Sequence, residues 1–250
     1  MSSTVTIGRL GNQCFRNLAA SLFAEKHNLY IVYNNNLEFL GFKLFCGKKK
    51  YITTIEVNDS NYLDLYEKES IDFNCKFASY FQSTKIALKI HEYLKSKIDT
   101  IVSNNKYNKN YNNNNDCFIH VRLGDVAKFN PGFNYYDKIL TNLQADKIYI
   151  STDDSNHKII HELFDKYKNI KLIDYSLEDA ILFGSTNKYV VLSHGTFSGI
   201  IGYLSFYSNV YFVKENSETS WDYFDGNGLF DIFKDHCTAI GKFNEIGKDV

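Results

Sequence analysis

The second half of the chain alternates short apolar segments with stretches whose apolar residues recur at helical spacing. This alternation is typical of a parallel β-sheet with helices on both faces, and it predicts an α/β fold. The expected strands are 117–122, 147–151, 170–174, 188–192 and 210–213, and the expected helices lie near 135–143, 156–167, 177–183 and 197–206.

The first hundred residues carry a sparser version of the same pattern. We expect a strand at 4–7, a turn at 8–12 and a helix in which Phe15 to Phe23 supply the apolar face. A second strand is expected at 29–33 and a further helix within 79–98. The region 38–74 has no periodicity that decides between helix and strand.

A polar tract, Ser103 to Asp116, separates the two halves and includes four consecutive asparagines. Such a segment has too few apolar side chains to build a core, so we interpret it as a surface loop or linker. We therefore expect an N-terminal α/β lobe at 1–110 and a C-terminal α/β lobe at 111–250. The alternative is a long surface insertion in one domain.

The overall charge and the cysteines limit the classes of partner and compartment. The net charge is −1, with 28 basic and 29 acidic residues, which argues against a general nucleic-acid binder. Five widely spaced cysteines without a C-x-x-C pattern indicate a reducing compartment. No segment has the pattern of a signal peptide or of a transmembrane helix. We expect a soluble cytoplasmic protein.

Three polar clusters directly follow expected strands. They are Arg122 to Asp125, Ser151 to Asp154 and Ser193 to Ser198. The carboxyl ends of parallel strands meet at one edge of a sheet, and ligands of open α/β sheets bind beyond that edge. The sequence therefore predicts a ligand site in the C-terminal lobe.

Arg122 is the strongest candidate in these clusters. A guanidinium group matches two phosphate oxygens through its planar fork, so we expect Arg122 to hold a diphosphate. Asp125 would steer the guanidinium or the acceptor hydroxyl. His120 would donate a hydrogen bond to a base or a phosphate. The alternatives are an arginine paired with a surface carboxylate and a histidine buried for structural reasons.

The segment around Thr196, Phe197 and Ser198 joins a strand to a helix. Free amides and the dipole at a helix start suit a phosphate, and the alternative is ordinary side-chain capping. Asp153 would accept hydrogen bonds from a guanine edge or from sugar hydroxyls, or it would stabilise the start of the next helix.

Near the N-terminus, Gly8 to Gln13 forms another strand–turn–helix junction. Arg9 and Asn12 would reach a phosphate or a sugar from it, and a plain tight turn is the alternative. The chain has no P-loop, no G-x-G-x-x-G and no D-x-D pattern. His157 and His161 lack a convincing third ligand for zinc, so we predict neither a metal nor a cofactor.

Taken in order, these motifs resemble the α-1,2-fucosyltransferase family, glycosyltransferase family 11, within the wider fucosyltransferases that share a His-x-Arg motif. The resemblance extends from residue 7 to about residue 205. It rests on Gly8 to Gln13, Tyr80 to Ser83, His120 to Asp125, Tyr135-Tyr136, Ser151 to Asp154 and Thr196 to Ser198.

The resemblance implies a GT-B-like fold, with two Rossmann-like lobes and a donor cleft between them. In this fold the lobe at 1–110 would lie on the acceptor side, and the lobe at 111–250 would bind the nucleotide sugar. It implies inverting, metal-independent transfer of fucose from GDP-fucose to a glycan hydroxyl. In this reading Arg122 and Asp125 are catalytic, and the donor is bound by Arg9, Asn12, His120, Asp153, Thr196, Phe197 and Ser198. Two alternatives remain: a transferase of the same fold with another nucleotide sugar, and a non-catalytic domain that binds nucleotide sugars or glycans.

Overall fold

The computed structural model describes residues 1–213 and Phe243–Ile246. These residues form two units, one comprising Met1–Asn104 and the other beginning at Asn105. The division falls inside the polar tract, earlier than the expected boundary at residue 110. Positions 214–242 and 247–250 of the expected C-terminal lobe lie outside the described residues. Within the described ranges, no helix is both long and apolar enough to cross a membrane.

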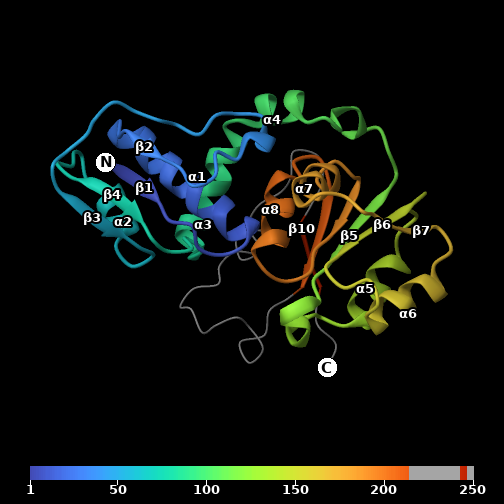
Figure 1. Cartoon of the computed structure of the whole chain (residues 1–250). Coiled ribbons are helices and arrows are strands. Elements are labelled where there is room, and N and C mark those ends of the chain that lie inside the picture. Colours follow the sequence, from blue (N-terminus) through green and yellow to red (C-terminus); the bar gives the residue numbers. More distant parts are fainter. Residues whose placement is uncertain (214–242, 247–250) are drawn as a thin grey trace. The chain divides into compact units, whose positions relative to one another are not determined.

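Unit 1 is built on a parallel sheet with the strand order β2-β1-β4-β3 (Figure 1). The edge strand β3 lies in the region 38–74, in which the sequence shows no clear periodicity, and its neighbour β4 begins at the end of that region. The strands are β1 (Ser2–Thr4), β2 (Ile31–Val32), β3 (Thr54–Val57) and β4 (Asn74–Phe77). The helices are α1 (Leu10–His27), η1 (Glu38–Leu40, 3-10), α2 (Tyr62–Tyr66), α3 (Thr84–Lys95) and α4 (Ile98–Asn104).

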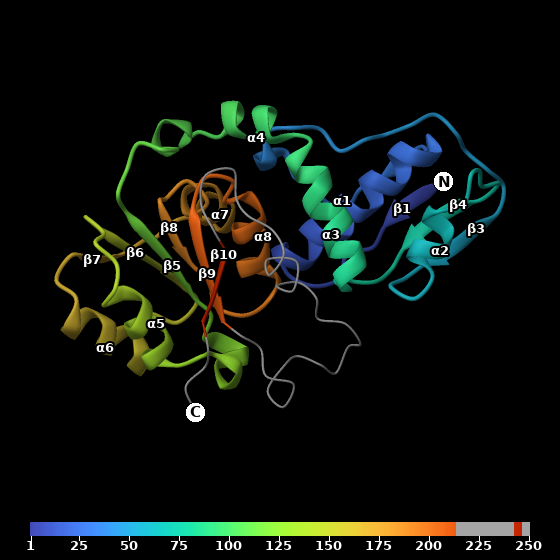
Figure 2. The ribbon, with the colours of Figure 1, turned by 180° about the vertical axis from the view of Figure 1, so that it is seen from behind.

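Helix α1 forms the centre of the core of unit 1. Its Phe23 ring contacts Phe77 of β4 and Tyr62 of α2, with ring centroids 5.5 and 5.7 Å apart. The helix ends at Asn28, which adopts the left-handed conformation and donates its N–H to the carbonyl of Ala24, a common way to end a helix. Helix α3 packs alongside α1, as Figures 1 and 2 show.

Unit 2 is built on a six-stranded parallel sheet with the order β10-β9-β8-β5-β6-β7. The predicted α/β class is thus confirmed. The strands are β5 (Cys117–Val121), β6 (Ile148–Thr152), β7 (Ile170–Leu172), β8 (Tyr189–Val191), β9 (Asn209–Val213) and β10 (Phe243–Ile246). The helices are η2 (Asn108–Asn110, 3-10), η3 (Gly124–Phe129, 3-10), α5 (Phe133–Leu140), α6 (Lys158–Lys166), α7 (Leu177–Gly184) and α8 (Thr196–Leu204).

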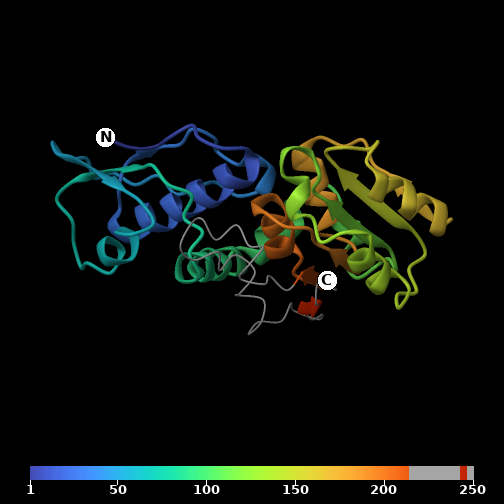
Figure 3. The same cartoon turned by 90° about the horizontal axis from the view of Figure 1, so that it is seen from below.

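The alternation of side chains along β5 assigns the two faces of this sheet. Cys117, Ile119 and Val121 belong to a buried cluster with side chains of α5 and α6. Phe118 points to the other face, where its ring contacts Phe183 of α7. Helices therefore cover both faces (Figures 1 and 3), as the sequence predicts. Because side chains alternate along a strand, His120 shares the face of Phe118.

The connections of unit 2 place a topological switch point between β5 and β8. From β5 the chain runs outward through β6 to β7, and it then returns to β8 on the other side of β5 before reaching β9 and β10. This is the strand order of Rossmann-type folds, whose ligands bind beyond the carboxyl ends of the strands at the switch point. In this unit those ends carry Arg122 and Ser193.

The polar tract is anchored by its asparagines rather than forming a free linker. Asn105 is buried and donates to the carbonyl of Leu182 at 3.2 Å. Asn114 donates to the carbonyl of Thr186 at 3.0 Å and accepts from the N–H of Lys188 at 3.1 Å. These amides satisfy backbone groups of unit 2, which explains how a segment without a core of its own is held in place.

Candidate functional site

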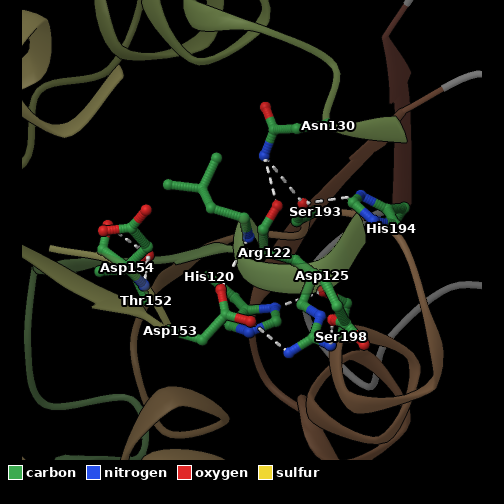
Figure 4. A network of polar contacts seen from close by, with 11 residues as sticks. His120, Arg122, Asp125, Asn130, Thr152, Asp153, Asp154, Ser193, His194 and Ser198 are labelled. Atoms are coloured by element: carbon green, nitrogen blue, oxygen red, sulfur yellow. Dashed lines mark hydrogen bonds and ion pairs between the residues drawn. The ribbon is translucent and has the colours of Figure 1, made fainter. Parts of the chain in front are cut away.

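Arg122 directly follows β5, and its guanidinium lies between two carboxylates (Figure 4). Nη1 donates to Oδ2 of Asp153, and Nη2 donates to Oδ1 of Asp125 at 2.6 Å. The arginine side chain is 18% exposed, compared with 28% for Asp153 and 55% for Asp125. Arg122 is therefore partly withdrawn from solvent, and Asp125 is the more accessible of its two partners.

Asp153 anchors Arg122 from the end of the neighbouring strand, β6. Besides the pair with Arg122, its Oδ1 accepts the backbone N–H of Leu123 at 2.7 Å. A Cβ atom at Gly124 would lie 2.5 Å from Oδ2 of Asp153, so a side chain at position 124 would displace this carboxylate. In the structure Asp153 thus pairs with Arg122 and with the Leu123 amide, and its predicted hydrogen bonds from a guanine edge or from sugar hydroxyls stay a prediction.

His120, on the opposite face from the α5/α6 cluster, meets the start of α8. Its Nδ1 and the hydroxyl oxygen of Ser198 share a 2.6 Å hydrogen bond, and its ring contacts Phe197 with centroids 4.9 Å apart. Full burial, followed by the charges of His194 and Arg122, lowers the pKa of His120 to about 3. The imidazole is therefore neutral at physiological pH and acts through hydrogen bonding, not through charge.

Helix α8 starts without a side-chain cap. Its N-cap is Gly195, with φ +88°, a conformation that favours glycine, and no side chain accepts from the first-turn amides in the capping position. No acidic residue lies in the first turn. The predicted alternative of Ser/Thr capping therefore does not hold for this helix, because the Ser198 hydroxyl bonds to His120 instead. The first turn of α8 therefore has no acidic side chain of its own to offset the positive end of the helix dipole.

The buried side chain of Asn130, which is not among the predicted site residues, links the loops after β5 and β8. Asn130 Nδ2 donates to the carbonyl of Arg122 at 2.9 Å, to the Tyr136 hydroxyl at 3.0 Å and towards the Ser193 hydroxyl at 3.4 Å (Figure 4). Its Oδ1 accepts from the N–H of Gly132 at 2.8 Å. The only sequence signal for Asn130 is the Asn-Pro-Gly turn that it begins.

Two of the predicted donor ligands belong to unit 1. Arg9 is the exposed N-cap residue of α1, and Asn12 lies in the first turn of that helix. Asn12 Oδ1 accepts from Gln82 at 3.1 Å. A Cβ at Gly8 would lie 2.6 Å from Nδ2 of Asn12. The proposed contact of Arg9 and Asn12 with a donor, and the predicted cleft between the lobes, stay predictions.

The two histidines considered for zinc have structural roles. His157 is the N-cap of α6 and accepts the N–H of Ile159 at 3.3 Å, while His161 Nε2 lies 3.1 Å from the carbonyl of Asn156. Across the part of the chain that the structure describes, no three His, Cys, Asp or Glu side chains are grouped as a metal site.

The sequence matches no family model and no curated protein. Among solved structures, the E. coli heptosyltransferase WaaC with ADP matches with a TM-score of 0.50 and 7% identity. This match covers 98% of this chain and 92% of that chain. The E. coli heptosyltransferase WaaC with ADP-2-deoxy-2-fluoro heptose matches with a TM-score of 0.49 and 7% identity, over 86% and 89% of the two chains.

The fold is that of a GT-B glycosyltransferase. Two units with parallel Rossmann-like sheets, as the sequence predicts, are what this fold requires. The likeness supports a glycosyltransferase fold. It does not single out the α-1,2-fucosyltransferase family. At 7% identity it shows the fold alone, and the chemistry has to be argued from the site itself.

Proposed function

We propose that this protein is a glycosyltransferase that uses a nucleoside-diphosphate sugar, and that Arg122 binds the diphosphate of the donor. One observation carries the proposal. A partly buried guanidinium lies at the carboxyl end of β5, at the switch point of a Rossmann-type sheet. Ligands of such sheets bind at this point, and a planar guanidinium suits two phosphate oxygens.

The charges around Arg122 define how the donor would enter. With His120 neutral, Arg122, Asp125 and Asp153 sum to −1 (+1 − 1 − 1), which disfavours an incoming anion. Asp125 is the exchangeable partner, since an exposed ion pair of this kind contributes only about 0–1 kcal/mol. We infer that the diphosphate displaces Asp125 from Nη2, while Asp153 keeps its bonds to Nη1 and to the Leu123 amide.

The start of α8 would stabilise the leaving group together with Arg122. Negative charge builds on the phosphate as the bond from the sugar to the diphosphate breaks, and positive charge spreads over the sugar ring. Fixed donors stabilise such charge best in a partly desolvated site. The uncapped first turn of α8 supplies amides, and Thr196 supplies a hydroxyl. Ser198, bonded to His120, holds this turn at the end of β5.

The displaced Asp125 would then serve as general base. In an inverting transfer the acceptor hydroxyl attacks the anomeric carbon, the electron pair of the breaking bond stays on the diphosphate, and the hydroxyl proton goes to the base. Once Nη2 of Arg122 is taken by the diphosphate, the carboxylate of Asp125 is available to accept the proton of the acceptor hydroxyl. The same event that fills the donor site therefore prepares the base, which couples donor binding to acceptor activation.

For the sugar, the motif resemblance favours fucose from GDP-fucose and an α-1,2 linkage to a glycan. The proposal includes no metal, because the resemblance implies metal-independent transfer and the sequence has no D-x-D pattern. Turnover is then expected to persist after treatment with EDTA. A loss of turnover that Mg²⁺ or Mn²⁺ restores would contradict the metal-independent form of the proposal.

The test is a panel of donors. The purified chain is incubated with GDP-fucose, GDP-mannose, UDP- and dTDP-sugars and an ADP-heptose, and the released nucleoside diphosphate is measured with and without glycan acceptors. The ADP-sugar is included because the structurally similar WaaC binds ADP. We expect release from GDP-fucose that depends on Arg122. Release from another donor would show that fucose is not the transferred sugar, while the transferase proposal would stand. Binding without release would indicate a non-catalytic domain.

A further inference from the structure

Unit 1 contains a completely buried arginine that the proposed transfer does not use. Arg16, on α1, has no exposed surface. Its Nε donates to the carbonyl of Ser79 and its Nη1 to the carbonyl of Val5, both at 2.9 Å. Its Nη2 has no hydrogen-bond partner in the part of the chain that the structure describes. Such buried donors are rare in native proteins and call for an explanation.

The position of this guanidinium in the sheet points to a ligand. Val5 directly follows β1 and Ser79 follows β4 after one residue, and these two strands are adjacent and parallel. The chain runs from β1 outward to β2 and then crosses to β3 and β4 on the other side. The switch point of unit 1 therefore lies between β1 and β4, and Arg16 bridges the carboxyl ends of both.

The charge of Arg16 has no counterion among the described residues, although buried charges are normally paired. Asp59 lies close to the loop after β4, but its carboxylate is bonded to other groups. It accepts from the Ser79 hydroxyl, from the Phe81 amide at 3.2 Å and from the Gln82 amide at 3.0 Å. No ion pair between Asp59 and Arg16 is present. Burial lowers the pKa of Arg16, as expected for a desolvated cation without a carboxylate partner.

Two further features of this edge suit an anion. Helix α1 is 18 residues long and begins without a side-chain cap and without an acidic residue in its first turn, so no acid of that turn offsets its positive dipole end. Helical side chains lean towards the N-terminus, and the bond from Arg16 to Val5 follows this direction. The loop after β4 holds Phe81 at φ +56°, a strained conformation that tends to occur at functional sites.

We propose that Arg16 is the centre of an oxyanion-binding subsite at the switch point of unit 1, for a carboxylate, sulfate or phosphate group. The Tyr80 ring, whose centroid lies 5.9 Å from Cζ of Arg16, is the group that we expect to move when the ligand reaches Nη2. The oxyanion has two conceivable sources, an acidic sugar of the acceptor and the phosphates of a nucleotide. The subsite does not depend on Arg122 or on the proposed transfer.

The subsite is tested by NMR on the full chain, titrated with inorganic phosphate against potassium chloride of equal ionic strength. We expect saturable shifts, in the millimolar range, of the Arg16 Nε–Hε signal and of the amides of Ser79 and Tyr80. The shifts should persist in Arg122→Ala, which removes the proposed donor site. They should disappear in Arg16→Met. Absence of saturable shifts, or their survival in Arg16→Met, would overturn the proposal.

Additional measurements identify the source of the oxyanion and cover the case in which Arg16→Met does not fold. In Arg122→Ala, shifts caused by glucuronate indicate an acidic acceptor, and shifts caused by GDP indicate a nucleotide. If Arg16→Met does not fold, the wild-type Arg16 Nε–Hε signal decides alone. Tyr80→Ala, which removes the ring near the guanidinium, should tighten phosphate binding several-fold. Unchanged or weaker binding in that variant would contradict the assigned route to Nη2.

Discussion

The guanidinium of Arg122 and the carboxylate of Asp125 form a 2.6 Å ion pair in which the arginine is mostly shielded and the aspartate is mostly exposed. This asymmetry matters because the proposed donor competes with Asp125 for the same nitrogen. Asp153, in contrast, is tied to both Arg122 and the Leu123 amide. The two carboxylates around one arginine therefore have different roles.

Replacing Asp125 by asparagine separates donor binding from catalysis. The competing charge is removed, so the donor dissociation constant should fall by up to about fivefold, the equivalent of roughly 1 kcal/mol. Turnover should fall by about a hundredfold because the base is lost. Calorimetry and initial rates measure the two effects. Asp154→Asn, one residue from Asp153 but without a bond to Arg122, is the matched control. Weaker donor binding in Asp125→Asn would refute the exchange of partners.

Gly124→Ala tests whether Asp153 positions Arg122. The added methyl group would lie 2.5 Å from the Asp153 carboxylate, and relieving such a clash typically costs about 1–3 kcal/mol. We expect donor affinity to weaken about tenfold. In the Asp153→Ala background the same substitution should have almost no further effect, because the clashing group is gone. Additive losses in the double variant would show that Gly124 acts in another way.

The buried neutral His120 predicts a loss of stability in acid. Its pKa is about 3 when folded, with burial as the main cause and smaller contributions from His194 and Arg122, whereas an unfolded histidine has a pKa near 6.5. Between these values the unfolded chain binds the additional proton, so stability falls by about 1.4 kcal/mol per pH unit below about 6.5.

The comparison for this prediction is His120→Gln, which cannot titrate in that range. From pH 7 to pH 5 the wild-type chain should lose about 2 kcal/mol more stability than the variant, measured by urea denaturation at both pH values. Contributions of the other histidines cancel in the difference. Parallel pH profiles for the two proteins would mean that His120 is not buried in its neutral form.

The sequence predicts the second half of the fold because its parallel strands are apolar and its helices periodic. It does not predict β3 and β4, because each strand has only four residues and half of them are polar. These polar residues are Thr54 and Glu56 in β3, and Asn74 and Lys76 in β4. Asn74 lies in a strand because its side chain satisfies the backbone of Tyr51. Such long-range satisfaction of polar groups leaves no periodic signal.

The candidate site, too, is predicted from the sequence only in part. The proximity of Arg122, Asp153 and the Ser198 turn follows from the rule that carboxyl ends of parallel strands share an edge. The partnership between Asp153 and Arg122 does not follow, because it depends on the room beside Gly124. Asn130 and Arg16 each have a partner 63 residues away, Ser193 and Ser79 respectively, so only the structure reveals these contacts.

The central claim, that Arg122 binds the diphosphate of the donor, is tested most directly by comparing two nucleotides. Calorimetry measures the affinities of the diphosphate released in the donor panel and of the matching monophosphate. The wild-type protein should bind the diphosphate more tightly than the monophosphate. So should the control variant Lys171→Ala, which removes an exposed cation of β7. Arg122→Ala should lose this preference and about a hundredfold in diphosphate affinity and in turnover, while its melting temperature stays close to that of wild type. An undiminished preference in folded Arg122→Ala would contradict the account.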